Sequence, residues 1–154
     1  MKPARRAAGG ESQVLRLFQP RSGHALIATR DPQIRGFVTE ALSRADYLVT
    51  ECGCVQREIL ERCGTKSPLF LIVDVTPQDS TGVDVVRELR ARGTSFPVIF
   101  LSSGPCEEAG VLGIESLSKP FTLESLELAI DRAFTRVSLA RLALEAQEEA
   151  SGPR

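Results

Sequence analysis

The stretch FLIVDV, residues 70–75, is the feature that most constrains how this chain folds. Its apolar side chains occupy odd and even positions alike, so a strand built from it must be covered on both faces, as in the centre of a parallel sheet. Four further short apolar runs alternate with segments in which apolar residues recur at helical spacing. The pattern predicts an α/β fold whose parallel strands lie at residues 25–28, 47–52, 69–73, 98–101 and 116–118.

Composition narrows the class of protein further. The chain has 154 residues, 42% of them hydrophobic and 25% charged, and a formal net charge of -1, which suits one soluble domain with its own core. No basic excess favours nucleic-acid binding, and no apolar run approaches the roughly 18 to 20 residues that a membrane span needs. The basic segment before His24 lacks the apolar centre of a signal peptide, so we expect a cytoplasmic protein.

The cysteines give little sign of a metal or redox site. They do not have the paired spacing of a zinc site, and His24 is the only histidine that could join them. Free cysteine usually packs as a small hydrophobic side chain. We therefore expect buried or half-buried thiols at Cys52, Cys54, Cys63 and Cys106.

A long helix is predicted at the C-terminal end of the chain. Thr122 is a suitable N-cap, Glu124 favours the first turn, and apolar residues follow a 3-4 spacing to Leu144, with the helix reaching about Glu149. We expect Leu123, Leu126 and Ile130 to pack on the sheet, whereas Val137, Ala140 and Leu144 continue the seam beyond the domain. That far end either pairs with a second copy or a partner helix, or it frays.

These features divide the chain into three parts. Residues 1–23 are expected to be a flexible basic segment, residues 24–137 a single domain, and residues 138–154 a helical extension and tail.

Polar side chains follow the predicted strands at the points where the strands end. The first strand leads into Thr29, Arg30 and Asp31; the third ends at Asp74; the fourth leads into Ser102 and Ser103; and Lys119 follows the fifth. Ligands in open parallel sheets bind outside the carboxyl ends of the strands. A carboxylate, a hydroxyl and an ammonium from separate strands are therefore expected to meet at this edge.

Three motifs carry a resemblance to a known family. FLIVDV with Gly82 eight residues after Asp74, PVIFLSS, and LSKPF together resemble the receiver domain of bacterial two-component response regulators, over residues 25–137. The resemblance implies a flavodoxin-like doubly wound sheet of five strands in the order 2-1-3-4-5. It also implies that Asp74 is the phosphoacceptor, that the Ser102 hydroxyl binds the phosphoryl group and that Lys119 pairs with it. A sensor histidine kinase or a downstream regulator is the implied partner.

One departure from that family concerns the metal. Receivers hold Mg²⁺ with an acidic pair at the end of the first strand, where this chain has Thr29 and Arg30. With that pair lost, only Asp74 and the neighbouring Asp31 remain as carboxylate ligands, so no Mg²⁺ or only weakly bound Mg²⁺ is expected. Arg30 can instead reach Asp74 directly and replace the ion as a permanent cation. The alternative is that Arg30 points into solvent and Asp31 supplies a shifted metal ligand.

A second departure concerns the helix before the last strand. The stretch between Ser102 and Lys119 is several residues shorter than usual in the family, which predicts a helix of one or two turns. We therefore expect a receiver-like interaction module with impaired phosphorylation rather than an enzyme. The alternative is a receiver that still accepts a phosphoryl group on Asp74. A nucleotide- or flavin-binding enzyme on a related fold is disfavoured, since no glycine-rich loop follows the first strand.

Overall fold

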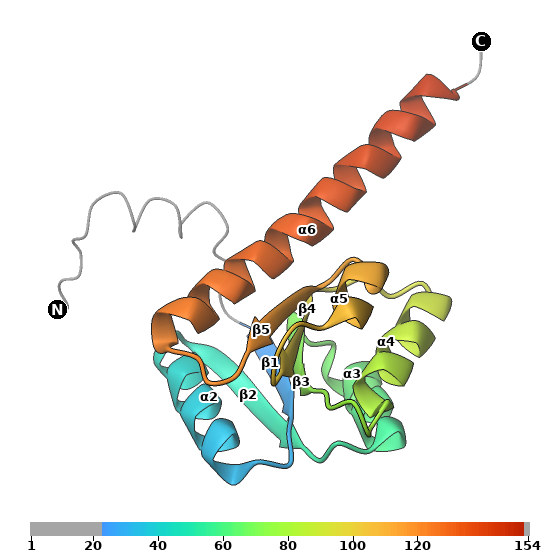
Figure 1. Ribbon diagram of the computed structural model, residues 1–154. Helices are drawn as coiled ribbons and strands as arrows, with labels where there is room; N and C mark the ends of the chain where they lie inside the picture. Colours follow the sequence, from blue (N-terminus) through green and yellow to red (C-terminus); the bar gives the residue numbers. More distant parts are fainter. Residues whose placement is uncertain (1–22, 153–154) are drawn as a thin grey trace, which may run out of the picture.

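The core of the molecule is one parallel sheet. The computed structural model describes residues 23–152, and its strands are β1 (Gly23–Ala28), β2 (Tyr47–Cys52), β3 (Phe70–Asp74), β4 (Val98–Ser102) and β5 (Glu115–Ser118). They form a 5-stranded sheet in the order β2-β1-β3-β4-β5 (Figure 1). The predicted fold class and strand order are confirmed, with small differences at the strand ends.

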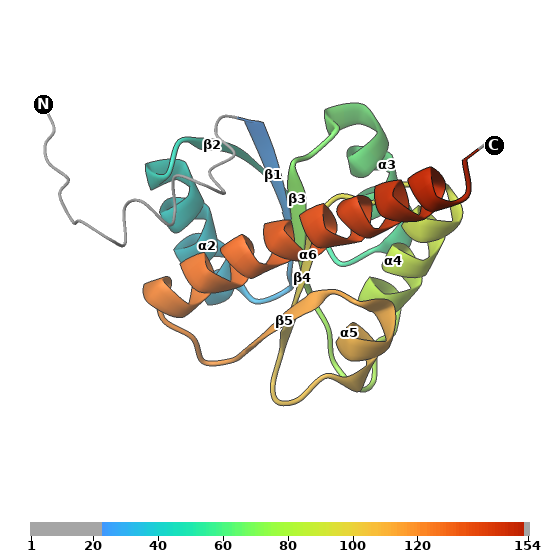
Figure 2. The ribbon, with the colours of Figure 1, turned by 90° about the horizontal axis from the view of Figure 1, so that it is seen from above.

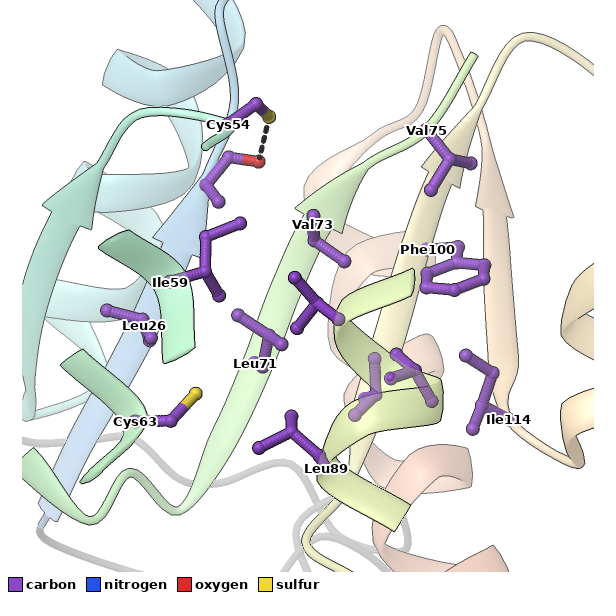
Figure 3. Packing of buried hydrophobic residues seen from close by; sticks show 14 of the residues in the cluster. Leu26, Cys54, Ile59, Cys63, Leu71, Val73, Val75, Leu89, Phe100 and Ile114 are labelled. Atoms are coloured by element: carbon purple, nitrogen blue, oxygen red, sulfur yellow. Dashed lines mark hydrogen bonds between the residues drawn. The ribbon is translucent and has the colours of Figure 1, made fainter. Parts of the chain in front are cut away.

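The central strand is buried on both sides, as its sequence predicts. Phe70 and Ile72 belong to one hydrophobic cluster, and Leu71 and Val73 belong to the other, because successive side chains of a strand point to opposite faces. Figure 3 shows the second cluster, in which side chains from the sheet meet those of the helices that cover it. The sheet thus separates two apolar layers of one domain.

The helices divide between the two faces of the sheet (Figures 1 and 2). Buried residues of α2 (Pro32–Arg44) and α6 (Leu123–Ala150) join the cluster of Phe70, while those of α3 (Gln56–Lys66), α4 (Thr81–Ala91) and α5 (Glu107–Leu112) join the cluster of Leu71. Helix α5 has only 6 residues, so the predicted short helix is confirmed.

Helix α6 begins and ends close to the predicted positions. The Thr122 side chain accepts a hydrogen bond from the Ser125 backbone N–H, and the Ser125 hydroxyl accepts one from the Thr122 N–H, which forms a capping box. Leu126 and Ile130 pack on the sheet as expected. The expectation for Leu123 is wrong, because its side chain is 48% exposed; Ala129 takes part in the buried face instead. The seam meets the sheet only after the first turn.

The cysteines are structural. Cys52, Cys54 and Cys63 are buried, Cys106 is half-buried, and all are free thiols, as predicted. The Cys54 thiol donates to the Ala28 carbonyl at 3.3 Å (Figure 3). Burial raises the pKa of Cys52 to about 12 and that of Cys63 to about 11, so these thiols stay protonated at neutral pH.

Two further expectations concern membrane-spanning helices and the N-terminal segment. No helix within residues 23–152 is both long and apolar enough to cross a membrane. The predicted basic N-terminal segment lies, apart from Gly23, outside the described residues.

Candidate functional site

Asp74 lies at the centre of the site. It is the last residue of β3, and the parallel sheet brings Thr29, which follows β1, and Lys119, which follows β5, to the same edge. The Lys119 Nζ lies 2.7 Å from Asp74 Oδ1, and the Thr29 hydroxyl donates to Asp74 Oδ2 at 2.8 Å. The Asp74 side chain is 11% exposed and that of Lys119 is 20% exposed. Both carboxylate oxygens therefore have a donor inside a largely enclosed pocket.

Thr29 connects the pocket to the turn that follows β1. It is fully buried, and its hydroxyl accepts the Asp31 backbone N–H at 3.1 Å while donating to Asp74. A hydroxyl can do both because it carries one donor and two lone pairs. The Thr29 carbonyl in turn accepts from the Arg35 guanidinium at 3.0 Å. Thr29 is thus a positioning residue for Asp74, a role that the sequence did not suggest.

Arg30 does not bind Asp74, and the prediction of a direct pair is wrong. Its Nη1 forms a salt bridge with Asp79 Oδ2, and its Nη2 donates to the Cys54 carbonyl at 3.2 Å. The Arg30 side chain extends to the β3–α4 loop, where it binds the carboxylate of Asp79. The solvent alternative is only partly right: this side chain is 64% exposed but paired.

Asp79 is the residue that sequence reasoning missed. It also accepts from the Thr81 hydroxyl at 2.6 Å and from the Thr81 backbone N–H at 3.0 Å. These bonds to Thr81 and the adjacent Arg30 guanidinium lower the pKa of Asp79 to about 2. A signal was present: an arginine at the end of the first strand needs a carboxylate, and TPQDSTG, after the neighbouring strand, supplies one.

Asp31 has a structural task. Its Oδ1 accepts the backbone N–H groups of Gln33 at 2.9 Å and Ile34 at 3.3 Å, so it is the N-cap of α2, with Pro32 in the first turn. The expected shifted metal ligand is therefore already engaged in starting a helix.

Ser102 and Lys119 are linked through the backbone. The Ser102 hydroxyl donates to the Gly104 carbonyl at 2.7 Å, and the Ser102 carbonyl accepts the Lys119 N–H at 2.7 Å. Ser102 is buried and Ser103 exposed. The Lys119–Pro120 bond is cis.

The residues around Asp74 do not fit a magnesium ion. This ion selects oxygen ligands, usually with one or two carboxylates. Here Asp31 caps a helix, Asp79 is paired with Arg30, and the Thr29 proton points to Asp74. Within the described part of the chain, no group of three His, Cys, Asp or Glu side chains is arranged to hold a metal. The charge of the Asp74 carboxylate is already compensated by groups of the protein itself, the Lys119 ammonium and the Thr29 hydroxyl.

A hollow adjoins this pocket between the loops that follow β3 and β4. Its volume is about 460 Å³, and its polar lining includes Asp79, Ser80, Arg87, Ser102 and Ser103. It offers a surface next to the Arg30–Asp79 pair rather than an enclosed cavity for a small molecule.

Comparison with curated proteins gives relatives of one kind, although no family model matches the chain. The KDP operon transcriptional regulatory protein KdpE of Escherichia coli is 31% identical over 120 residues, which cover 75% of this chain and 52% of KdpE. The response regulator MprA of Mycobacterium ulcerans is 32% identical over 116 residues, covering 72% of this chain and 49% of MprA. The chain spans about half the length of these relatives.

Solved structures give the same result. The chemotaxis protein CheY4 of Vibrio cholerae superposes with a TM-score of 0.64 at 24% identity, covering 73% of this chain and 99% of CheY4. The N-terminal domain of the nisin resistance regulator NsrR, a lantibiotic response regulator, gives a TM-score of 0.62 at 26% identity, with 73% and 97% covered. Fold, strand-end residues and relatives agree: the chain contains a receiver domain of the response-regulator family of bacterial two-component signal transduction.

Proposed function

We propose that this receiver domain works as a protein-interaction module and that Mg²⁺-dependent phosphorylation of Asp74 is impaired. The observation that carries the proposal is the pairing at the end of β1, where the Thr29 hydroxyl binds Asp74 and Arg30 binds Asp79. The side chains at this edge that could otherwise bind a metal ion are engaged with one another. The pocket then keeps one arrangement without an ion.

The chemistry of phosphoryl transfer supports this proposal. An aspartate attacks phosphorus through a free oxygen, and catalysis depends on cations that neutralise the charges of the transferred group. In this pocket Oδ1 of Asp74 is paired with Lys119, and Oδ2 accepts from Thr29. The Arg30 charge is taken up by Asp79, so Lys119 is left as the cation in contact with Asp74. Slow or absent transfer is the expected consequence.

A second candidate is a receiver that still accepts a phosphoryl group on Asp74 from a histidine kinase. The contact between Lys119 and Asp74 at 2.7 Å favours it, because the acceptor and its cation lie together at the sheet edge. A short segmental shift of Thr29 would free Oδ2. The two candidates differ in whether a phosphodonor modifies the native chain.

The partners are proposed from the same family. A sensor histidine kinase or a downstream regulator would meet the edge that carries Asp74, the hollow beside it and the Arg30–Asp79 pair. Residues 24–137 are proposed as the receiver unit and residues 138–154 as its helical extension.

The test is intact-mass analysis after incubation with a small-molecule phosphodonor and Mg²⁺. We expect the native chain to gain little or no phosphoryl mass, as does an Asp74→Ala control. A donor-dependent gain that disappears in Asp74→Ala would replace the proposal with the second candidate.

A further inference from the structure

A half-buried apolar patch lies at the edge of the sheet where the strands begin. Tyr47 of β2, Leu69 just before β3 and Phe134 of α6 pack against the hydrophobic cluster of Phe70, and each is only half-buried. The Phe70 ring lies between two of them: its centroid is 5.1 Å from that of Tyr47 and 5.7 Å from that of Phe134. We call Tyr47, Leu69 and Phe134 the amino-edge patch. It extends from β2 to α6.

Gly23 leads the chain past this patch. It is the first residue of β1 and is paired with Tyr47 in the sheet. Its φ is +152°, and a Cβ there would lie 2.5 Å from Leu69 Cδ1, so glycine lets the backbone pass close to Leu69. The residues that precede Gly23 therefore start from the amino-edge patch itself.

The first half of α6 places acidic side chains beside the patch. Glu127 and Asp131 lie seven and three residues before Phe134, so they project from the same side of the helix. The opposite side carries Arg136, whose Nε lies 2.8 Å from a carboxylate oxygen of Glu115 in β5. The side of α6 that borders the patch is therefore the acidic one.

The segment before β1 has the complementary character. Residues 13–22 read QVLRLFQPRS, with four large apolar side chains in the first six positions. Arg16 lies among these side chains, and Arg21 lies two residues before Gly23. An extended chain advances about 3.3 Å per residue, so Phe18 is close enough in sequence to reach across the patch.

We propose that residues 13–22 lie across the amino-edge patch. Their apolar side chains cover its three half-buried residues, and Arg16 and Arg21 lie beside Glu127 and Asp131. Apolar burial stabilises the docked segment, and charge complementarity selects the acidic side of α6. Docking restricts the flexibility expected for this basic segment and ties the start of β1 to the projecting helix. It is independent of phosphoryl transfer at the site.

Tyr47 supplies a probe of the patch, because it is the only tyrosine and the chain has no tryptophan. We expect acrylamide to quench its fluorescence more strongly in Phe18→Asp than in the native full chain. The charge should shift the docking equilibrium toward the open state by about tenfold or more, because it replaces a buried aromatic side chain. Ala8→Asp, which makes the same charge change outside residues 13–22, is the matched control and should leave the quenching unchanged.

Limited trypsin cleavage of the full chain tests the position of the segment on α6. The bond after Arg16 lies in the docked segment and the bond after Arg6 lies outside it, and a peptide of residues 1–22 gives the intrinsic rates of both. We expect slow cleavage after Arg16 alone. Glu127→Gln with Asp131→Asn should raise that rate by about threefold or more, because two ion pairs are lost.

The matched control for this pair of changes is Glu148→Gln with Glu149→Gln, which removes the same charge at the far end of α6 and should leave the rate after Arg16 unchanged. Circular dichroism checks that every variant is folded. Equal quenching of Tyr47 in the native chain and in Phe18→Asp would overturn the proposal. So would cleavage after Arg16 as fast as in the free peptide, or faster cleavage in the control pair alone, which would place the segment at the far end of the helix.

Discussion

In the turn after β1, Thr29 makes a hydrogen bond to the carboxylate of the site and Arg30 makes an ion pair with a loop carboxylate. The hydroxyl of Thr29 reaches Asp74 at 2.8 Å, and the guanidinium of Arg30 reaches Asp79 instead of Asp74. A guanidinium keeps its charge at any pH at which the protein folds, so the ion pair between the turn after β1 and the β3–α4 loop depends on the charge of Asp79. At the scale of single residues, the pocket is defined by these hydrogen bonds and ion pairs.

Restoring carboxylates at the end of β1 should restore metal binding. In the double variant Thr29→Asp with Arg30→Asp, Mg²⁺ affinity should rise by about tenfold or more, because carboxylate oxygens are the ligands this ion selects. Calorimetric titration of the variant and the native chain gives the comparison. An unchanged affinity in a folded variant would mean that other side chains determine the pocket.

Asp79 should make the stability of the fold depend on pH. Bonds from Thr81 and the charge of Arg30 hold its pKa at about 2, below the ordinary 3.8, so the folded state favours the carboxylate. The resulting stabilisation is fully present above about pH 4 and is lost as the pH falls through about 2. Asp79→Asn should therefore be less stable than the native chain at pH 6, and this difference should shrink between pH 4 and pH 2.

Urea unfolding of the two proteins across this pH range is the measurement. An equal difference in unfolding free energy at every pH would show that the charge of Asp79 contributes nothing. Arg30→Gln serves as the control, because it keeps the bonds from Thr81, which are the larger cause of the lowered pKa.

At the scale of elements, the position of α4 depends on a glycine. A Cβ at Gly82 would lie 2.6 Å from Val75 Cγ1 and 3.3 Å from Val73 Cγ2, so α4 packs against β3 more closely than any larger residue permits. The same loop between β3 and α4 carries Asp79. The helix packing therefore helps to hold the loop carboxylate within reach of Arg30.

Gly82→Ala should destabilise the domain by about 1–3 kcal/mol, the usual cost of overpacking a core, despite alanine's better helix propensity. Gly36→Ala in α2 is the matched control, since a Cβ there meets nothing within 4 Å. It should stabilise the fold by about 0.5–1 kcal/mol. Chemical denaturation of both variants decides the matter, and a Gly82→Ala protein as stable as the native chain would contradict the close-packing argument.

Elements could be predicted from the sequence where one local pattern dominates. FLIVDV is apolar on both faces and became the central strand, and Thr122 became the N-cap of α6. Leu123 was misplaced because spacing gives the face of a helix but not the turn at which the helix meets the sheet. The partner of Arg30 was misplaced because Asp79 is distant in sequence, and no local pattern states which of two nearby carboxylates a long side chain reaches.

At the scale of the whole molecule, the receiver fold carries a pocket with Thr29 and Arg30 beside it and a long projecting helix. The receiver fold places Asp74 and Lys119 together, and the Lys119 contact alone does not separate an active receiver from an inactive one. We propose that the difference lies in Thr29 and Arg30, the two residues that follow β1; Arg30 connects this turn to the β3–α4 loop through its salt bridge with Asp79.

Phosphoryl gain in one paired reaction tests the account most directly. The native chain and the Thr29→Asp, Arg30→Asp variant are incubated with the same small-molecule phosphodonor, with and without Mg²⁺, and their intact masses are compared over time. We predict that the variant gains one phosphoryl group in a reaction that requires both Mg²⁺ and Asp74, while the native chain gains little or none. Equal, Mg²⁺-dependent modification of Asp74 in the native chain would contradict the account.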